Sequence, residues 1–247
     1  MKIICVDLDK TLLRSDLSIS EYTLDVLSKC KENGHLIVID TARNLERTRK
    51  YSKLINADYT ICNAGSQIFN KDLELIYDKP IPKEVVSIVT KQVIEYCDIL
   101  SIQAKDILYT NIDKELNSGR VLFPDDLYMF DAYKILCCNL NIDITNIVSQ
   151  YGLEYVKYEE GYWGRISLVD VNKLSGITYV LNRINKNLND VIYFGDDIGD
   201  IPCIKECGCG VAMSNSVQMV LEIANYICDS NDNDGVAKFI DTMFNIG

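Results

Sequence analysis

The sequence of 247 residues contains a single histidine, His35. A catalytic triad, a zinc site or a proton shuttle in this protein could therefore use only this one histidine. His35 follows Asn33 and Gly34 and opens the apolar run at residues 36–39, which is typical of the entrance to a strand rather than of an active site. If the chain is an enzyme, we expect carboxylates to do its chemistry.

Basic residues are also in short supply, since 25 Lys and Arg face 36 Asp and Glu and give a formal net charge of −11. A surface with this charge repels nucleic-acid phosphates and anionic lipids. The basic residues that do gather, at residues 43–53, have the spacing of a solvated helix face. We therefore expect a small-molecule partner, with no nucleic acid and no membrane.

Long apolar stretches are missing near the first residue, where only four apolar residues lie between Lys2 and Asp7, too few for a secretory leader or a membrane span. Several of the ten cysteines lie inside strand-like apolar runs, which predicts free buried thiols and a cytoplasmic protein. Cys203, Cys207 and Cys209 lack the paired CxxC spacing of a zinc site, so structural thiols are favoured there. We expect a monomer or a homodimer.

What the sequence does contain is an alternation of buried strands and helices. Apolar β-branched runs at residues 2–6, 36–39 and 59–62 alternate with helical patterns, and the same rhythm resumes from Lys173 with a strand at residues 191–194. This order predicts βαβ units in an α/β fold with a doubly wound, Rossmann-like parallel sheet. The apolar content of 48% supplies a sizeable core.

The rhythm changes at Pro80 and Pro82, half of the four prolines in the chain. A helical pattern carrying Val86 and Val89 follows, and then several alternating strand-like runs. These features predict an inserted α+β cap domain at residues 80–165, with a core formed by residues 1–79 and 166–247.

Acidic residues follow several of the predicted parallel strands, and ligands bind at the carboxyl ends of such strands. A single aspartate there commonly caps the next helix, but like charges that converge in one crevice cost stability unless a cation neutralises them. All-oxygen ligands without histidine suit Mg²⁺. Thr41 is also consistent with a plain turn hydroxyl and Lys173 with a solvated lysine. The acids at these positions are Asp7, Asp9, Asp40, Asp196, Asp197 and Asp200.

These residues resemble the motifs of a known family. Residues 7–13, DLDKTLL, resemble the DxDxT[LV] signature of the haloacid dehalogenase (HAD) superfamily. Thr41 matches its second motif, Lys173 its third, and residues 195–200, GDDIGD, its fourth, usually GDxxND. Residues 210–216 and 231–236 are similar to runs of the Cof-type subfamily, which carries a C2-type cap where this chain has its insert. The resemblance implies a HAD core with such a cap.

The resemblance also implies a Mg²⁺-dependent phosphatase that acts on a small phosphorylated metabolite, such as a sugar or cofactor phosphate. Asp7 would be the nucleophile that forms an aspartyl-phosphate, and Asp9 the general acid and base. Thr41 and Lys173 would bind the phosphoryl oxygens. The implied metal ligands are Asp7, the backbone carbonyl of Asp9, Asp196 and Asp200, the last of which would alternatively hold Lys173 in place.

Substrate selectivity is expected from the rim of the crevice and from the cap. Arg43 and Asn63 are the candidates on the core, and Trp163 and Arg165 are the candidates on the cap. For the cap residues, ordinary packing or a hairpin turn is an equally simple interpretation.

Two alternatives stay open. A sugar phosphomutase needs a cap that grips a second phosphate, and residues 80–165 hold 13 acidic against 8 basic residues, which weighs against it. A phosphate-ester-binding protein with weak or lost turnover is favoured by Gly199, which stands where the family usually has Asn. The retention of Asp7, Asp9 and Lys173 argues for an enzyme.

Overall fold

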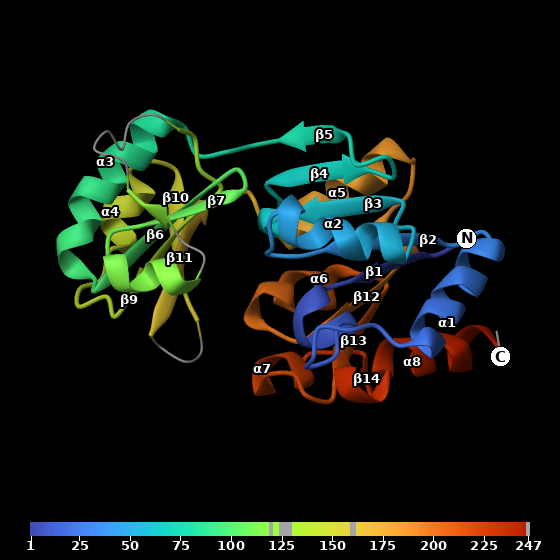
Figure 1. Ribbon diagram of the computed structural model, residues 1–247. Helices are drawn as coiled ribbons and strands as arrows, with labels where there is room; N and C mark the ends of the chain where they lie inside the picture. The colour runs from blue at the N-terminus through green and yellow to red at the C-terminus, as the bar shows by residue number, and fades with distance from the viewer. Residues whose placement is uncertain (119–120, 124–129, 159–161, 246–247) are drawn as a thin grey trace. The chain divides into compact units, whose positions relative to one another are not determined.

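The chain forms two compact units in the computed structural model, which describes residues 1–118, 121–123, 130–158 and 162–245 (Figure 1). The first unit combines Met1–Asp78 with Asn172–Gly247, and the second is Lys79–Val171. The boundary expected after residue 165 falls inside strand β11 (Trp163–Leu168), which pairs with two strands of the second unit. The second unit therefore extends to Val171, because cutting β11 would break its sheet.

The first unit is built on a central sheet with the strand order β14-β13-β12-β1-β2-β3-β4-β5 in the part of the chain that the structure describes. From β14 to β3 the neighbours are parallel, and β4 and β5 add an antiparallel hairpin at one edge. The expected doubly wound α/β sheet is confirmed. The strands are β1 (Ile3–Val6), β2 (Leu36–Asp40), β3 (Tyr59–Cys62), β4 (Gln67–Asn70), β5 (Leu75–Asp78), β12 (Val191–Gly195), β13 (Cys209–Met213) and β14 (Tyr226–Cys228).

Helices cover both faces of this sheet, which is why its central strands are continuous apolar runs. Ile4 and Val6 of β1 lie in the core shared with α1, α2 and α8, whereas Ile3 and Cys5 lie in the core shared with α5, α6 and α7. The helices are α1 (Glu21–Glu32), α2 (Leu45–Leu54), α5 (Lys173–Arg183), α6 (Ile201–Glu206), α7 (Gln218–Leu221) and α8 (Gly235–Phe244). No helix in the described part of the chain is long and apolar enough to cross a membrane.

The second unit is an α+β structure with its own core. Its described strands have the order β10-β11-β9-β6-β7-β8, and Val86 and Val89 of α3 pack with Ile135 and Ile166 of the sheet. Its helices are α3 (Lys83–Val93) and α4 (Thr145–Ser149). Its other strands are β6 (Ile99–Ala104), β7 (Ile107–Thr110), β8 (Val121–Leu122), β9 (Lys134–Cys138) and β10 (Leu153–Lys157).

All ten cysteines are free thiols, and only Cys97 is not buried. Cys203 and Cys207 pack in the core beside α5, where burial raises the pKa of Cys207 to about 12. A buried, protonated thiol is a poor nucleophile and a poor metal ligand. The burial of Cys203, Cys207 and Cys209 is what we expect of structural thiols.

Candidate active site

The acidic residues gather at one edge of the central sheet because the strands that precede them are parallel neighbours. β12, β1 and β2 lie side by side, so their carboxyl ends meet at the same edge. Asp7 directly follows β1, Thr41 follows β2, and Asp196 follows β12. All three side chains are buried.

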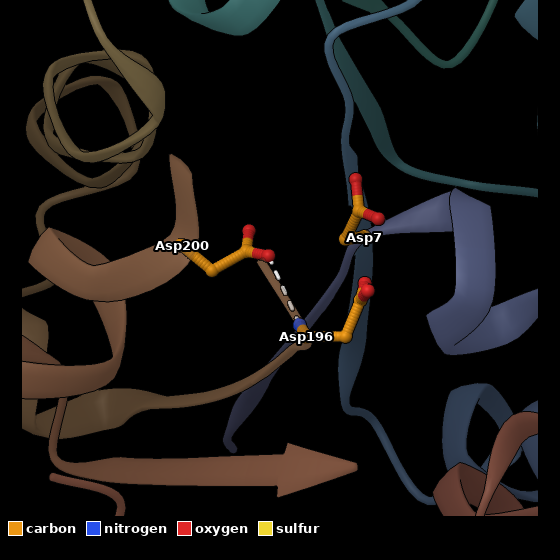
Figure 2. A group of neighbouring side chains, drawn as sticks. All are labelled: Asp7, Asp196 and Asp200. Atoms are coloured by element: carbon orange, nitrogen blue, oxygen red, sulfur yellow. Dashed lines mark hydrogen bonds between the residues drawn. The ribbon is translucent and has the colours of Figure 1, made fainter. Parts of the chain in front are cut away.

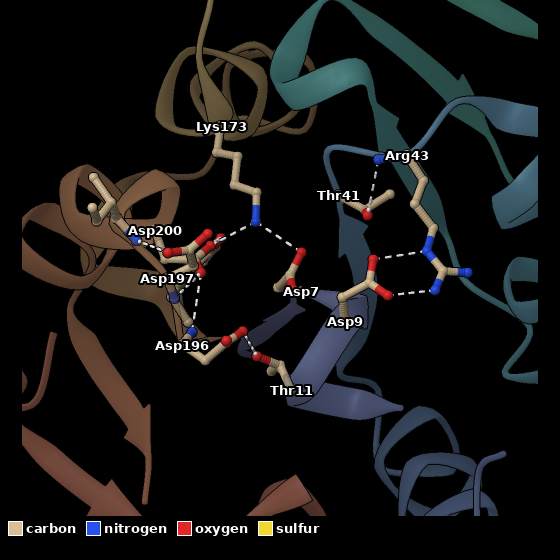
Figure 3. A network of polar contacts seen from close by, with 11 residues as sticks. Asp7, Asp9, Thr11, Thr41, Arg43, Lys173, Asp196, Asp197 and Asp200 are labelled. Atoms are coloured by element: carbon tan, nitrogen blue, oxygen red, sulfur yellow. Dashed lines mark hydrogen bonds and ion pairs between the residues drawn. The ribbon is translucent and has the colours of Figure 1, made fainter. Parts of the chain in front are cut away.

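Lys173 reaches this edge from the first position of α5. Asn172 and Ser175 form a capping box at the start of that helix, which fixes where the lysine side chain begins. Its Nζ lies 2.8 Å from Asp7 Oδ1 and 2.6 Å from Asp200 Oδ1 (Figure 3). Burial alone would lower the pKa of Lys173, but the charges of Asp200 and Asp7 raise it well above its usual range. The lysine is therefore a fixed cation beside Asp7.

Asp200 has a hydrogen bond for every lone pair of its carboxylate. Oδ1 accepts from Lys173 Nζ and, at 2.6 Å, from the hydroxyl of Tyr193. Oδ2 accepts from the backbone N–H groups of Asp196 and Asp197, both at 3.0 Å. A carboxylate offers about four such acceptor positions. This geometry favours the second of the two roles expected for Asp200, which is to hold Lys173 and the loop after β12.

Asp200 packs against the backbone at the end of β12, and this close packing requires glycine at position 195. A Cβ atom on Gly195 would lie 2.5 Å from the carboxyl carbon of Asp200, closer than such atoms approach. Gly199 is different, because a Cβ there meets nothing within 4 Å. A residue with a Cβ atom at position 199 would therefore not clash at that atom, so this loop does not require glycine for space there.

Three carboxylates form a group that could hold a metal ion. Asp7, Asp196 and Asp200 each offer an oxygen, and these atoms lie within 4.8 Å of one another (Figure 2). Burial, with a contribution from neighbouring acids, raises the pKa of Asp7 and brings that of Asp196 to about 7. Buried acids that repel one another are the arrangement that a divalent cation stabilises.

Asp7 and Asp196 also have oxygen atoms left to bind such an ion. Asp7 Oδ1 accepts from Lys173, and Asp196 Oδ1 accepts from the hydroxyl of Thr11 at 2.8 Å. Among the described residues, the second oxygen of each carboxylate accepts no hydrogen bond. An all-oxygen donor set with free positions suits a hard cation such as Mg²⁺.

Asp9 is held by an arginine rather than by the acid cluster. Arg43 Nε donates to Asp9 Oδ2 at 2.8 Å, and Arg43 Nη2 pairs with Asp9 Oδ1 (Figure 3). Partial burial alone would raise the pKa of Asp9, but the hydrogen bonds and charge of Arg43 lower it below its usual range. The structure thus holds Asp9 in its carboxylate form. The sequence contained both residues as site candidates but gave no sign that they pair.

Thr41 and Asn63 stand beside Arg43 in neighbouring loops. The backbone N–H of Arg43 donates to Thr41 Oγ1 at 3.2 Å, and its carbonyl accepts from the N–H of Asn63 at 2.8 Å. Asn63 Nδ2 donates to Gln67 Oε1 at 3.0 Å, while its buried Oδ1 has no partner among the described residues. An unpaired buried amide oxygen is a group that a ligand can satisfy.

The loop that carries Asn63 is fixed against α5. Gly65 has φ +100°, and a Cβ there would lie 2.1 Å from the carbonyl oxygen of Asn172. This close approach joins the loop after β3 to the residue that begins α5, and so to Lys173. The contact requires glycine for both its backbone angle and its lack of a side chain.

Trp163 and Arg165, the candidates on the second unit, lie on β11. Arg165 Nη2 is 3.7 Å from Glu154 Oε1, and its buried Nε has no hydrogen-bond partner among the described residues. Trp163 is half-buried and pairs in register with Cys138 of β9. Their part in substrate binding stays a prediction.

One buried residue near the site, Tyr193, was missed by the sequence analysis, and a second, Asp40, was counted among the acids at the strand ends without a role of its own. Tyr193 lies inside the apolar run of β12, where nothing in the pattern distinguishes its hydroxyl from ordinary packing. Asp40 ends β2 with no exposed surface, and neither of its oxygens accepts a hydrogen bond within the described residues. Burial therefore raises the pKa of Asp40 well above its usual range.

Comparison with known proteins agrees with this geometry. Residues 4–240 match the family model of haloacid dehalogenase-like hydrolases. The chain is 25% identical to the 5-amino-6-(5-phospho-D-ribitylamino)uracil phosphatase YitU of Bacillus subtilis (strain 168), over 99% of this chain and 98% of that protein. It is 26% identical to YcsE of the same organism, which has the same activity in its name, over 97% of this chain and 94% of that protein.

Solved structures share the fold over the whole chain. BT1666 from Bacteroides thetaiotaomicron, described among phosphatases of the haloalkanoate (HAD) enzyme superfamily, superposes with a TM-score of 0.86 at 20% identity and covers 100% of this chain and 96% of its own. The HAD subclass IIB sugar phosphatase BT4131 gives a TM-score of 0.80 at 19% identity, with full coverage of both chains. The chain therefore belongs to the haloacid dehalogenase-like hydrolase family, as a phosphoric monoester hydrolase.

Proposed function

We propose that the protein is a Mg²⁺-dependent phosphatase that hydrolyses a small phosphorylated metabolite through an aspartyl-phosphate on Asp7. The observation that supports this most directly is the position of Asp7. Its buried carboxylate lies at the end of β1, is paired with Lys173 at 2.8 Å, and shares a cluster with Asp196. One oxygen of Asp7 is held by the lysine, which leaves the other to attack phosphorus.

Lys173 and Thr41 would bind the phosphoryl group during the transfer. The attack on phosphorus moves negative charge onto the phosphoryl oxygens, and a fixed buried cation stabilises that charge more than an exposed one does. Asp200 and the start of α5 keep the lysine in place, so little rearrangement is needed in the transition state. Thr41 lies one residue beyond β2 at the same edge of the sheet.

Asp9 would act as the acid in the first step and as the base in the second. The carboxylate form, which the pair with Arg43 maintains, is the form that removes a proton from the attacking water. Donating a proton to the leaving oxygen requires the acid form, which Asp9 gains only when Arg43 moves away from it. We therefore infer that substrate binding displaces Arg43.

A magnesium ion fits the free oxygen of Asp196 and the second lone pair of Asp7 Oδ1, so that Asp7 Oδ2 stays free to attack phosphorus. The backbone carbonyl of Asp9 is a third donor in this proposal. When bound, the ion neutralises part of the charge on the phosphoryl oxygens and orients the ester. In the part of the chain described, Asp200 has no lone pair to spare, so its role is to hold Lys173.

The substrate class is a small phosphate ester with a polar, sugar-like leaving group. Two relatives are named as phosphatases of a phosphoribitylamino-uracil, and a structural neighbour is described as a sugar phosphatase. Arg43 and Asn63 would contact the leaving group, and a contribution of Trp163 and Arg165 to selectivity is a separate prediction. The ten free thiols support a reducing compartment, which we take to be the cytoplasm.

Release of inorganic phosphate from p-nitrophenyl phosphate tests the proposal. We expect turnover that depends on added Mg²⁺ and is abolished in Asp7→Asn, because the amide is not a nucleophile. Mass spectrometry after acid quenching should find phosphate on a peptide containing Asp7. An Asp7→Asn protein that melts like the wild type yet retains turnover would contradict the assignment. Conversion of a sugar phosphate to its isomer without release of free phosphate would contradict the phosphatase activity.

A further inference from the structure

A hollow of about 560 Å³ lies on the first unit along helix α2, and its lining is mainly basic. Its charged residues are Arg43, Glu46, Arg47, Arg49, Lys50 and Lys53, which makes five cations and one acid. The whole chain has the opposite balance, with a net charge of −11. This local reversal is the feature that the proposed phosphatase reaction leaves unexplained.

The cations of the hollow are mostly without acidic partners. Within the described residues, Arg47, Lys50 and Lys53 form no ion pair, and Arg49 Nε is 3.9 Å from Glu46 Oε2, a marginal contact. Lys50 lies three residues from Arg47 and three from Lys53 on the helix, so its side chain neighbours both of theirs. Like charges at this spacing destabilise a helix, and the chain tolerates that cost here.

An aromatic ring holds two of these cations at the wall of the hollow. Tyr51 is buried, and its hydroxyl donates to the carbonyl oxygen of Leu17 at 3.1 Å, which fixes the ring. Lys50 Nζ lies 4.5 Å from the ring centroid, and Arg43 Cζ lies 5.5 Å from it. Cations at these distances are attracted to the ring face. The positive wall is therefore partly preorganised, unlike a helix face whose lysines move freely in water.

We propose that this hollow binds a compact polyanion, a ligand with two or three linked phosphate groups. A single phosphate cannot neutralise the three cations that lack an acidic partner, whereas a di- or triphosphate can contact several of them. A long nucleic acid is disfavoured, because most of it would extend past the basic hollow. The attraction of the hollow is screened beyond a Debye length of about 8 Å, and the rest of the protein surface is acidic.

Isothermal titration of the whole protein with inorganic triphosphate tests this site, in EDTA so that no turnover occurs. The test variant is Arg47→Gln/Lys50→Gln. The matched control is Arg183→Gln/Lys205→Gln, which removes the same two charges from exposed positions on α5 and α6. We expect the dissociation constant to rise about tenfold or more in the test variant and to stay within about twofold in the control. Inorganic monophosphate should bind at least about tenfold more weakly than triphosphate.

Several outcomes would overturn the proposal. These are no measurable binding by the wild type, equal weakening in both double variants, or unchanged binding in the test variant, which would move the ligand to the site of Lys173. Tighter binding of a single-stranded oligonucleotide than of triphosphate would overturn the choice of ligand. All four substituted side chains are exposed, so thermal melting should show intact folds, and Lys53→Gln repeats the test with a single change. Because the assay involves no hydrolysis, its result is independent of the phosphatase proposal.

Discussion

The polar residues of the two units differ in how firmly they are held. In the first unit, Lys173 and Asp200 are each bonded to partners from distant parts of the chain, and the group is buried. In the second unit, Arg165 has one ion pair at 3.7 Å, and Trp163 is half-buried on its strand. Reaction chemistry needs fixed groups, whereas recognition of a variable leaving group tolerates adjustable ones. The difference favours our proposal that the first unit carries the chemistry, and a role of the second unit in selectivity stays a prediction.

Replacing Lys173 with methionine should have the largest effect. The change removes the cation between Asp7 and Asp200 and leaves two buried carboxylates without their partner. We expect turnover to fall by about a thousandfold and stability to fall by about 3 kcal/mol. Phosphate release and urea unfolding measure the two effects. Arg183→Gln on the same helix is the control, and near-normal turnover in Lys173→Met would break the comparison.

Metal binding should counteract the loss of stability that we expect as the pH rises. In the fold, Asp196 has a pKa of about 7 and that of Asp7 is also raised, whereas an unfolded chain releases these protons near pH 4. Between about pH 4 and about pH 8, the folded protein therefore binds more protons than the unfolded chain. Without metal, its free energy of unfolding should fall as the pH rises over this range. Added Mg²⁺ should stabilise more at pH 8 than at pH 5.

Urea unfolding in EDTA and in Mg²⁺ measures this dependence. Asp196→Asn removes one of the titrating groups, so its stability should vary less with pH and its response to Mg²⁺ should be smaller. A metal-free wild type that gains stability over this pH range would show that the acid cluster does not behave as described.

Tyr193→Phe should have an intermediate effect. The variant keeps the ring but loses the hydroxyl that donates to Asp200 at 2.6 Å, so we expect a loss of about 1 kcal/mol in stability and a fall of about tenfold in turnover. Tyr179→Phe is the matched control, because its hydroxyl donates to the Ile76 carbonyl, at 2.9 Å, away from the acid cluster. Equal turnover in the two variants would mean that the Tyr193 hydroxyl contributes only to stability.

Trp163→Ala should have the smallest effect on the reaction itself. If the second unit governs selectivity, kcat/KM should change by different factors for different sugar and cofactor phosphates, while hydrolysis of p-nitrophenyl phosphate changes by less than about threefold. Trp163→Phe, which keeps an aromatic ring, should lie between the wild type and the alanine variant. A uniform loss across substrates would indicate packing alone.

The sequence was most informative where one element determines the outcome. The apolar runs of β1, β2 and β12 predicted buried parallel strands, and their order predicted that Asp7, Thr41 and Asp196 would follow them at one edge. The sequence did not show which residues from different segments would pair with each other. The pair of Asp9 and Arg43 joins residues 34 positions apart, and periodicity within a strand or helix says nothing about such contacts.

The domain boundary and the basic helix show the same limit. We expected the second unit to end at residue 165, but β11 continues to Leu168. Leu168 pairs with Leu153 of β10, and the sequence around residue 165 contains no sign of that pairing. The spacing of bases on α2 predicted a solvated face, and the spacing alone contains no sign of the hollow or of the fixed Tyr51 ring.

The buried carboxylates also bear on how long the protein survives in a cell. Asp40 has no exposed surface, and its oxygens accept no hydrogen bond within the described residues. With the cluster of Asp7 and Asp196, we expect it to lower the stability of the metal-free fold. A ligand that binds only the folded state offsets such a cost in proportion to its free concentration. Because proteases act on the unfolded fraction, we expect the abundance of this protein to follow the magnesium supply even when its synthesis is constant.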